Sequence, residues 1–156
     1  MKMKKRLISI AMAAVMAVGS IPAAGALLDG FNNTSTYSDQ FTDVPSTAWY
    51  YNSVKSAYEL GITAGTSASK FSPDQNLTTD QLTVFLARIH AAYHHNEIVE
   101  VQNPSSWTDK YYYYVEQYID SSYRDSIFGG RDNEQRWHFA YWISKALPDS
   151  AYTAIN

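Results

Sequence analysis

The sequence predicts an all-α protein of tandem helix–loop–helix modules packed as a small helical bundle. Three observations support this fold class. Apolar residues recur at helical spacing in four stretches, glycine and proline separate the first two stretches, and the later pair repeats the spacing of the earlier pair. Because an amphipathic helix cannot bury its apolar face alone, each of the four needs a partner.

The first pair of helices lies between residues 50 and 92. The first helix presents one apolar face through Tyr50, Val54, Ala57 and Tyr58. Gly61 is suited to end it, since a left-handed backbone costs glycine no Cβ clash. The second helix opens at Thr78, which forms a predicted capping box with Gln81. Its apolar stripe consists of Leu82, Phe85, Leu86 and Ile89.

A second, degraded copy follows a polar linker at residues 96–106. Trp107-Thr108-Asp109 echoes Phe41-Thr42-Asp43. Two apolar sets then repeat the helical stripes: Val115, Ile119, Ser122 and Tyr123, and later Phe139, Trp142, Ile143 and Ala146. Val115 follows Tyr50 by 65 residues, whereas Phe139 follows Leu82 by only 57. The second copy is therefore expected to lack the connecting loop of the first.

The start of the chain is typical of a secretory signal peptide over residues 1–26. Four basic residues precede an apolar stretch from Leu7 to Gly19, and Ala24-Gly25-Ala26 offers a small-residue cleavage site. The alternative is an uncleaved anchor, but the apolar stretch is shorter than the roughly 20 residues that a bilayer requires. We expect no membrane span after cleavage. Residues 27–40 lack periodicity and are predicted to be a flexible linker.

The charge of the chain argues against a nucleic-acid-binding protein, and its cysteine content rules out a disulfide-stabilised fold. Of 12 basic and 15 acidic residues, four basic ones lie in the predicted leader, which leaves eight against 15 and a net charge of −7. Nucleic-acid binding is therefore disfavoured, although a local cationic pocket could still bind an anionic glycan. Cysteine is absent, so disulfides cannot stabilise the fold.

Residues 41–78 also carry a family resemblance. Phe41-Thr42-Asp43-Val44, Trp49, Gly61-Ile62-Thr63-Ala64-Gly65, Phe71-Ser72-Pro73-Asp74 and Leu77-Thr78 resemble an S-layer homology domain in order and spacing. The resemblance implies a first module at residues 41–95 and a degenerate second module at 107–147. Such modules work in sets and bind secondary cell-wall polysaccharides attached to peptidoglycan. Residues 148–156 are then expected to be a tail that resembles the entry to a missing third module.

The resemblance also implies candidate polysaccharide-binding residues in both modules: Asp43, Trp49, Gly65 and Thr78, then Asp109, Arg136 and Trp137. The family places an arginine after the threonine of its Thr-Arg-Ala-Glu motif, but this chain has Thr79 there. In the second copy Arg136 falls at that position, and it is either an anion contact or an ordinary surface residue. Asp43 has a structural alternative, which is to hold loop N–H groups near the helix start.

These observations favour a secreted, non-catalytic protein of the cell wall or cell surface, with no cofactor. The alternative is a structural or interaction protein that keeps the fold for self-assembly, including as a homo-oligomer, or for partner binding. An enzyme is disfavoured because the sequence has no nucleophile elbow, zinc-ligand spacing or phosphate loop. His90 and His94 lie one helical turn apart, but two ligands are too few to predict a metal site.

Overall fold

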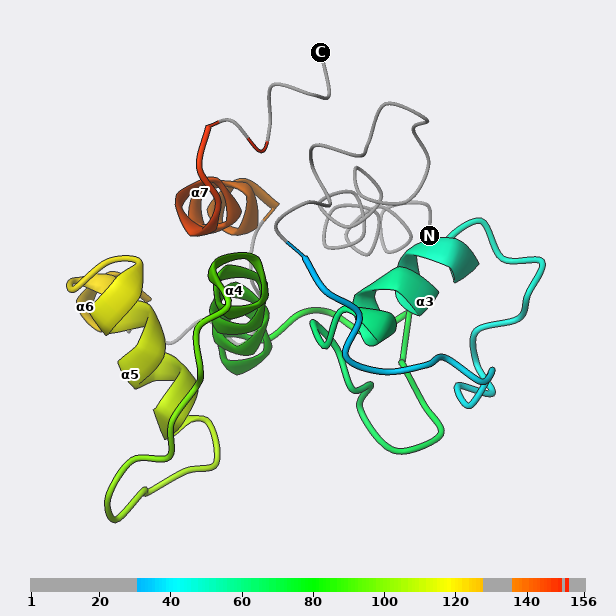
Figure 1. Cartoon of the computed structure of the whole chain (residues 1–156), viewed down its shortest axis with the longest axis horizontal. Coiled ribbons are helices and arrows are strands. Elements are labelled where there is room, and N and C mark those ends of the chain that lie inside the picture. Colours follow the sequence, from blue (N-terminus) through cyan, green and yellow to red (C-terminus); the bar gives the residue numbers. More distant parts are fainter. Residues whose placement is uncertain (1–30, 128–135, 150, 152–156) are drawn as a thin grey trace. The chain divides into compact units, whose positions relative to one another are not determined.

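The structure is a computed structural model that describes residues 31–127, 136–149 and 151. These residues form helices, and within those ranges the only extended pairing is an isolated bridge between Ser67 and Lys70. The predicted all-α fold is confirmed (Figure 1). The predicted signal peptide lies outside the described residues. The chain divides into two compact units, Met1–Asn76 with Ser150–Asn156 and Leu77–Asp149, and each is described by itself.

The first unit is built around helix α3, Tyr51–Glu59, and an aromatic cluster that packs on it. Val54 is fully buried among Tyr37, Phe41 and Val44, and Phe71 packs against this set. The Phe41 ring lies 5.6 Å from Tyr58 and 6.0 Å from Phe71 between centroids. The helix is short, so its stability comes from this packing rather than from its own hydrogen bonds.

Helix α3 ends where the glycine was expected to end it. Gly61 has a φ of +72°, and its N–H donates to the carbonyl oxygen of Tyr58 at 3.0 Å. The next N–H, of Ile62, donates to Ala57 at 2.9 Å. These two bonds form a Schellman motif, which satisfies carbonyl groups that the helix end would otherwise leave free.

The segment predicted to be a flexible linker has no helix over residues 31–40, yet it contributes to the packing of the first unit. Tyr37 is buried, with its ring 5.7 Å from that of Phe41 and 5.7 Å from that of Tyr58. The N–H of Thr34 donates to the carbonyl oxygen of Glu59 at 2.8 Å. Burial of an aromatic ring orders this stretch without any periodic pattern, because one large side chain supplies the contact area.

The second unit is organised around helix α4, Thr79–His94, which contacts both α5, Asp109–Tyr118, and α7, Arg136–Ala146. Figure 1 shows α4 next to both α5 and α7. The apolar stripe predicted for α4 is confirmed, since Leu82 and Leu86 are fully buried and Ile89 is nearly so. The predicted stripe of α7 is also confirmed, with Phe139, Trp142, Ile143 and Ala146 all buried.

One predicted helix is two helices in the structure. The spacing of Val115, Ile119, Ser122 and Tyr123 indicated a single stripe, but α5 ends at Tyr118 and a separate helix α6 covers Tyr123–Ile127. The carboxylate of Asp120 accepts a hydrogen bond from the N–H of Ser122 at 2.9 Å, which competes with continuation of the helix. Val115 and Tyr123 remain buried, whereas Ser122 is exposed.

A polar network ties the second unit together through its tyrosines. The hydroxyl of Tyr123 lies 3.0 Å from Oγ1 of Thr83 on α4, and the hydroxyl of Tyr112 donates to Asp80 at 2.8 Å. The Tyr123 ring also meets Trp142 of α7 edge to face, with centroids 4.5 Å apart. Buried tyrosine hydroxyls need such partners, and here they join α4 to α5 and α6.

The boundary between the two units lies between Asn76 and Leu77, inside the predicted first module of residues 41–95. Helix α3 therefore belongs to the first unit, whereas α4 packs on α5 and α7 of the second. The module boundaries stay a prediction. None of the helices in the described part of the chain combines the length and the hydrophobicity that a membrane crossing needs.

Candidate functional site

Asp43 fastens the connecting loop of the first unit. Its two carboxylate oxygens accept hydrogen bonds from the N–H groups of Phe71 and Ser72, at 3.0 and 2.8 Å. A third loop contact lies next to it, where the N–H of Thr42 donates to the carbonyl oxygen of Ser69 at 3.0 Å. The structural role expected for Asp43 is thus present, but its partners are loop groups 28 and 29 residues away and not those of the helix start.

The two N–H donors favour the charged form of this carboxylate. Partial burial alone would raise the pKa of Asp43, but the hydrogen bonds from Phe71 and Ser72 outweigh it and hold the pKa below its ordinary value. Because the pKa is lower in the folded state, the interaction stabilises the fold above the unfolded pKa of about 3.9. This stabilisation is lost as the pH falls through the lower, folded pKa.

Replacing Asp43 by asparagine is expected to cost about 2 kcal/mol at neutral pH, because one loop N–H then faces an amide NH₂ instead of an acceptor. The difference between the variant and the parent should shrink as the pH falls below about 4. Amide hydrogen exchange at Phe71 and Ser72 measures both effects locally. Asp74→Asn, at an exposed carboxylate nearby, is the control. A difference that stays constant down to pH 2 would contradict the assignment.

Gly65 occupies a position that only glycine fits. Its φ is +80°, and a Cβ added there would lie 2.5 Å from the carbonyl oxygen of Lys70 and 2.5 Å from Cε1 of Phe41. Its N–H donates to Oγ1 of Thr63 at 3.1 Å. Gly65 therefore lets the loop close against Phe41 of the aromatic cluster, in the same loop whose N–H groups at Phe71 and Ser72 bind Asp43.

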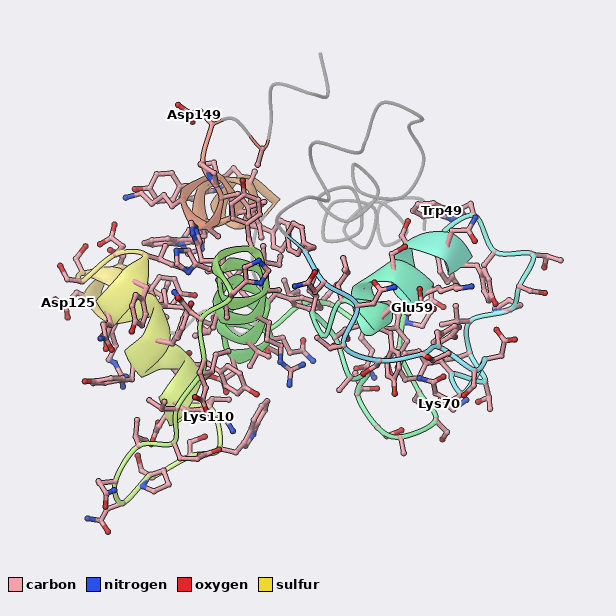
Figure 2. The ribbon with its side chains drawn as sticks, in the orientation of Figure 1. Trp49, Glu59, Lys70, Lys110, Asp125 and Asp149 are labelled. Atoms are coloured by element: carbon pink, nitrogen blue, oxygen red, sulfur yellow. The ribbon has the colours of Figure 1, made fainter. Side chains whose placement is uncertain are left out.

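Among the described residues of the first unit, Trp49 is the most exposed aromatic one, with 56% of its surface accessible. It lies just before helix α3 (Figure 2), and its ring meets Tyr50 edge to face with centroids 5.4 Å apart. An exposed indole next to a second ring offers a flat apolar face with little conformational freedom. Such a face suits stacking against a sugar ring, so the position of Trp49 is compatible with its predicted role.

Thr78 forms the predicted capping box at the start of α4. Its Oγ1 accepts from the N–H of Gln81 at 3.2 Å, and its own N–H donates to Oε1 of Gln81 at 3.0 Å. Both groups of the motif are thus engaged within the helix start. The first helical residue is Thr79, where the family resemblance would place an arginine, so this helix start carries no cation of its own at that position.

Asp109 has the same type of role as Asp43 but different partners. Its Oδ2 accepts from the N–H of Ser105 at 2.7 Å, from the Ser105 hydroxyl at 2.9 Å and from the N–H of Ser106 at 2.9 Å. These bonds from Ser106 and Ser105 lower the pKa of Asp109. The second copy thus keeps the aspartate, but it binds the linker just before α5 and does not reach across a loop.

Arg136 and Trp137 open helix α7. The Arg136 side chain lies outside the described part, but its place as the first residue of α7 matches that of Thr79 in α4, as the repeat predicted. Trp137 is 61% exposed. One turn further along the same helix, Tyr141 is 47% exposed, so the two rings lie on one face.

Two residues of this face were not predicted from the sequence. The ammonium of Lys145 lies 5.1 Å from the Tyr141 ring centroid, and it forms an ion pair with Asp120 at 2.6 Å. The bond from Lys145, with those from Ser122, lowers the pKa of Asp120 to about 2. The spacing of Trp137, Tyr141 and Lys145 at successive turns was a readable signal, since residues four apart share a helix face.

The two histidines of α4 contact each other, and His90 also contacts a tyrosine of α5. Nδ1 of His90 lies 3.0 Å from the hydroxyl of Tyr114, and the His90 and His94 rings are 4.2 Å apart. Burial, assisted by His94, lowers the pKa of His90 to about 4, so it is neutral at physiological pH. Among the described residues no group of three or more metal-binding side chains comes together.

The predicted site residues therefore fall into separate groups. Asp43 and Gly65 shape one loop of the first unit, where Trp49 is exposed. In the second unit Thr78 and Asp109 fix the starts of α4 and α5. Arg136 and Trp137 begin α7. Most of the polar side chains in this set hold backbone N–H groups, whereas the two tryptophans are largely exposed to solvent.

Comparison with known proteins identifies the class of module. The S-layer homology domain model matches residues 40–81, which include Asp43, Trp49, Gly65 and Thr78. The chain therefore contains an S-layer homology domain, and this domain indicates a protein associated with the cell surface.

A curated relative is an endoglucanase from Bacillus sp. (strain KSM-635), which is 39% identical over 57 residues. The alignment covers 36% of this chain and 6% of the endoglucanase, so the chain spans only a small part of that relative. No solved structure matches the chain.

Proposed function

We propose that this protein is a non-catalytic cell-wall-binding protein that recognises a secondary polysaccharide attached to peptidoglycan. The observation that carries the proposal is the S-layer homology match over residues 40–81. Export through the predicted signal peptide would bring the protein to the wall. The acidic chain would then bind an anionic polymer through local groups and not through its overall charge.

In each unit the proposed binding residues divide into those that shape the backbone and those that contact the ligand. Asp43 and Gly65 hold the loop of the first unit in one conformation, and Thr78 and Asp109 do the same for two helix starts. Contact falls to Trp49, and to Arg136 and Trp137 at the start of α7. A guanidinium suits an acidic sugar because it can donate two parallel hydrogen bonds to one carboxylate.

We propose a non-catalytic role although the curated relative is an endoglucanase. That name belongs to a protein of which the aligned stretch is 6%, so its activity is not carried over. Binding by a preformed surface needs exposed aromatic faces and a cation, and the described residues of both units offer such faces at Trp49 and Trp137. No acid–base pair or nucleophile is required for this role.

One observation favours the alternative of a structural or interaction protein. The well-matched module has Thr79 at the position where the resemblance expects the sugar-binding arginine. A module that lost this cation could keep its fold for self-assembly, with the exposed aromatic residues as the contact surface.

Co-sedimentation with purified cell walls tests the proposal. The purified protein should pellet with walls, and Arg136→Ala should weaken binding about tenfold, the effect of losing one charged hydrogen-bond donor. Lys55→Ala, which removes a positive charge from helix α3, is the control and should bind like the parent. Protein that stays in the supernatant, and whose mass by light scattering is that of a dimer or trimer, would favour the alternative.

A further inference from the structure

A second surface of the second unit combines an exposed indole with two cations. It consists of Trp107, Tyr111 and Lys110 at the start of α5 and of Arg88 on α4, and we call it the Trp107 cluster. We propose that the Trp107 cluster binds a sugar unit that carries a carboxylate or phosphate, with the ring stacked on Trp107 and the acid group on Arg88. The inference rests on the proposed function, because it takes the ligand to be an acidic wall glycan.

The indole of Trp107 is exposed to solvent and packs against the buried ring of Tyr111. Trp107 has 66% of its surface accessible, more than the other large apolar residues of the described chain. Its ring meets Tyr111 edge to face, with centroids 6.0 Å apart, and Tyr111 is itself buried. A buried neighbour restricts the motion of the indole, so its open face is held ready for a ligand at a low entropic cost.

Arg88 brings a cation from α4 to Tyr111, the same ring that Trp107 contacts. Its Nη2 donates to the hydroxyl of Tyr111 at 3.1 Å, and the guanidinium carbon lies 5.4 Å from the Tyr111 ring centroid. Among the residues that the structure describes, Arg88 has no carboxylate partner. A guanidinium has five N–H donors, so several remain for an acid group of a ligand.

Lys110 adds a second positive charge. Its ammonium lies 5.4 Å from the Tyr111 ring centroid and forms an ion pair with the exposed carboxylate of Glu100. That bond raises the pKa of Lys110, while the charge of Arg88 acts in the opposite direction because the two cations are close. Glu100 offsets the charge of Lys110, whereas the guanidinium of Arg88 forms no such ion pair among the described residues.

The carboxylate of Asp109 does not pair with Arg88. Asp109 is adjacent in sequence, but its oxygen is held by Ser105 and Ser106, and the cation that lowers its pKa is Arg124. The Trp107 cluster therefore offers one flat apolar face and one guanidinium with free donors. This combination matches an acidic sugar, whose ring is apolar on its faces and charged at one substituent.

The chemical shift of the Trp107 indole N–H in ¹H–¹⁵N spectra tests the inference. The probes are galacturonate oligosaccharides for a carboxylate, glucose 6-phosphate for a phosphate, and neutral cello-oligosaccharides. We expect a saturable shift with one or both acidic probes and none with the neutral one. An equal shift with the neutral probe, or no shift with either acidic probe, would overturn the inference.

Variants separate the roles of the residues. Arg88→Gln should weaken binding of the acidic probe about tenfold, the size of one charged hydrogen bond. Trp107→Ala should weaken it by a similar factor through loss of ring stacking, and the backbone amide of Tyr111 is its reporter because the indole is gone. Arg88→Lys keeps the charge without the forked donors and should lose less, so it guards against a simple folding defect in Arg88→Gln. Each variant must retain the dispersed amide spectrum of the parent. Unchanged affinity in Arg88→Gln would contradict the assignment.

The outcome is separable from that of the proposed function. If walls pellet the protein but the Trp107 indole does not respond to acidic sugars, this inference fails and wall binding stands. If acidic sugars shift the Trp107 indole but walls do not pellet the protein, the sugar site stands and the proposed function fails.

Discussion

Replacing Gly65 by alanine is expected to lower the free energy of unfolding of the first unit by about 3 kcal/mol. A non-glycine residue in the left-handed region costs about 1–2 kcal/mol. Overpacking costs about 1–3 kcal/mol more, because the new Cβ would lie 2.5 Å from the carbonyl oxygen of Lys70 and from the Phe41 ring. Urea titration, with hydrogen exchange of the Ile62 amide as the local reporter, measures the loss.

Gly61→Ala is the matched control for this prediction. Gly61 has a similar φ of +72°, but the three atoms nearest to its added Cβ all belong to the Thr34 side chain, with Oγ1 at 2.9 Å. A side chain can rotate away, whereas a backbone carbonyl in a closed loop cannot. We therefore expect a loss of about 1 kcal/mol at Gly61. Equal losses at the two glycines would show that the loop is not closed as described.

Replacing Trp142 by alanine is expected to cost the second unit about 4 kcal/mol, as large-to-small changes of buried aromatic residues do. Only 1% of Trp142 is accessible, and its ring packs on Tyr123. The change also removes the Nε1–H bond to Nε2 of buried His138, which spans 2.7 Å. Accelerated amide exchange in α4 and α7, together with a lower midpoint in urea, would measure the loss.

Trp137→Ala provides the comparison on the same helix. Because Trp137 is 61% exposed, its removal should change the free energy of unfolding by no more than about 0.5 kcal/mol. A variant at Trp142 that unfolds like the one at Trp137 would contradict the burial of Trp142 between α7 and the rest of the second unit.

The elements that depend on local sequence could be predicted. The capping box of Thr78 and Gln81 involves groups three residues apart, and the end of α3 at Gly61 depends on one backbone angle. The stripe of Leu82 and Leu86 follows from helical periodicity alone. In each case the residues that decide the structure lie within one or two helical turns.

Elements decided by distant partners could not be predicted in the same way. The partners of Asp43 lie 28 and 29 residues along the chain, and Tyr37 packs into a cluster from a stretch with no periodic pattern. The break between α5 and α6 also escaped prediction. Periodicity alone did not show that the Asp120 carboxylate would take the N–H of Ser122.

The sequence predicted where single residues of the candidate site lie, but it did not predict the contacts between helices. The repeat placed Arg136 at the start of a helix, where α7 begins, and the resemblance selected Asp43 and Gly65, which shape a loop in the structure. The Trp107 cluster was not predicted as a unit, because Arg88 and Tyr111 meet only when α4 packs on α5. Contacts between helices carry no signal in a single stretch of sequence.

The central claim is that this protein binds the secondary polysaccharide of the cell wall. Removing that polysaccharide from the wall tests the claim most directly. Purified protein would be sedimented with intact cell walls and with peptidoglycan from which the secondary polysaccharide has been removed by acid. If the secondary polysaccharide is the ligand, the protein pellets with intact walls and remains in the supernatant with the extracted peptidoglycan. Equal pelleting with both preparations, or none with intact walls, would contradict it.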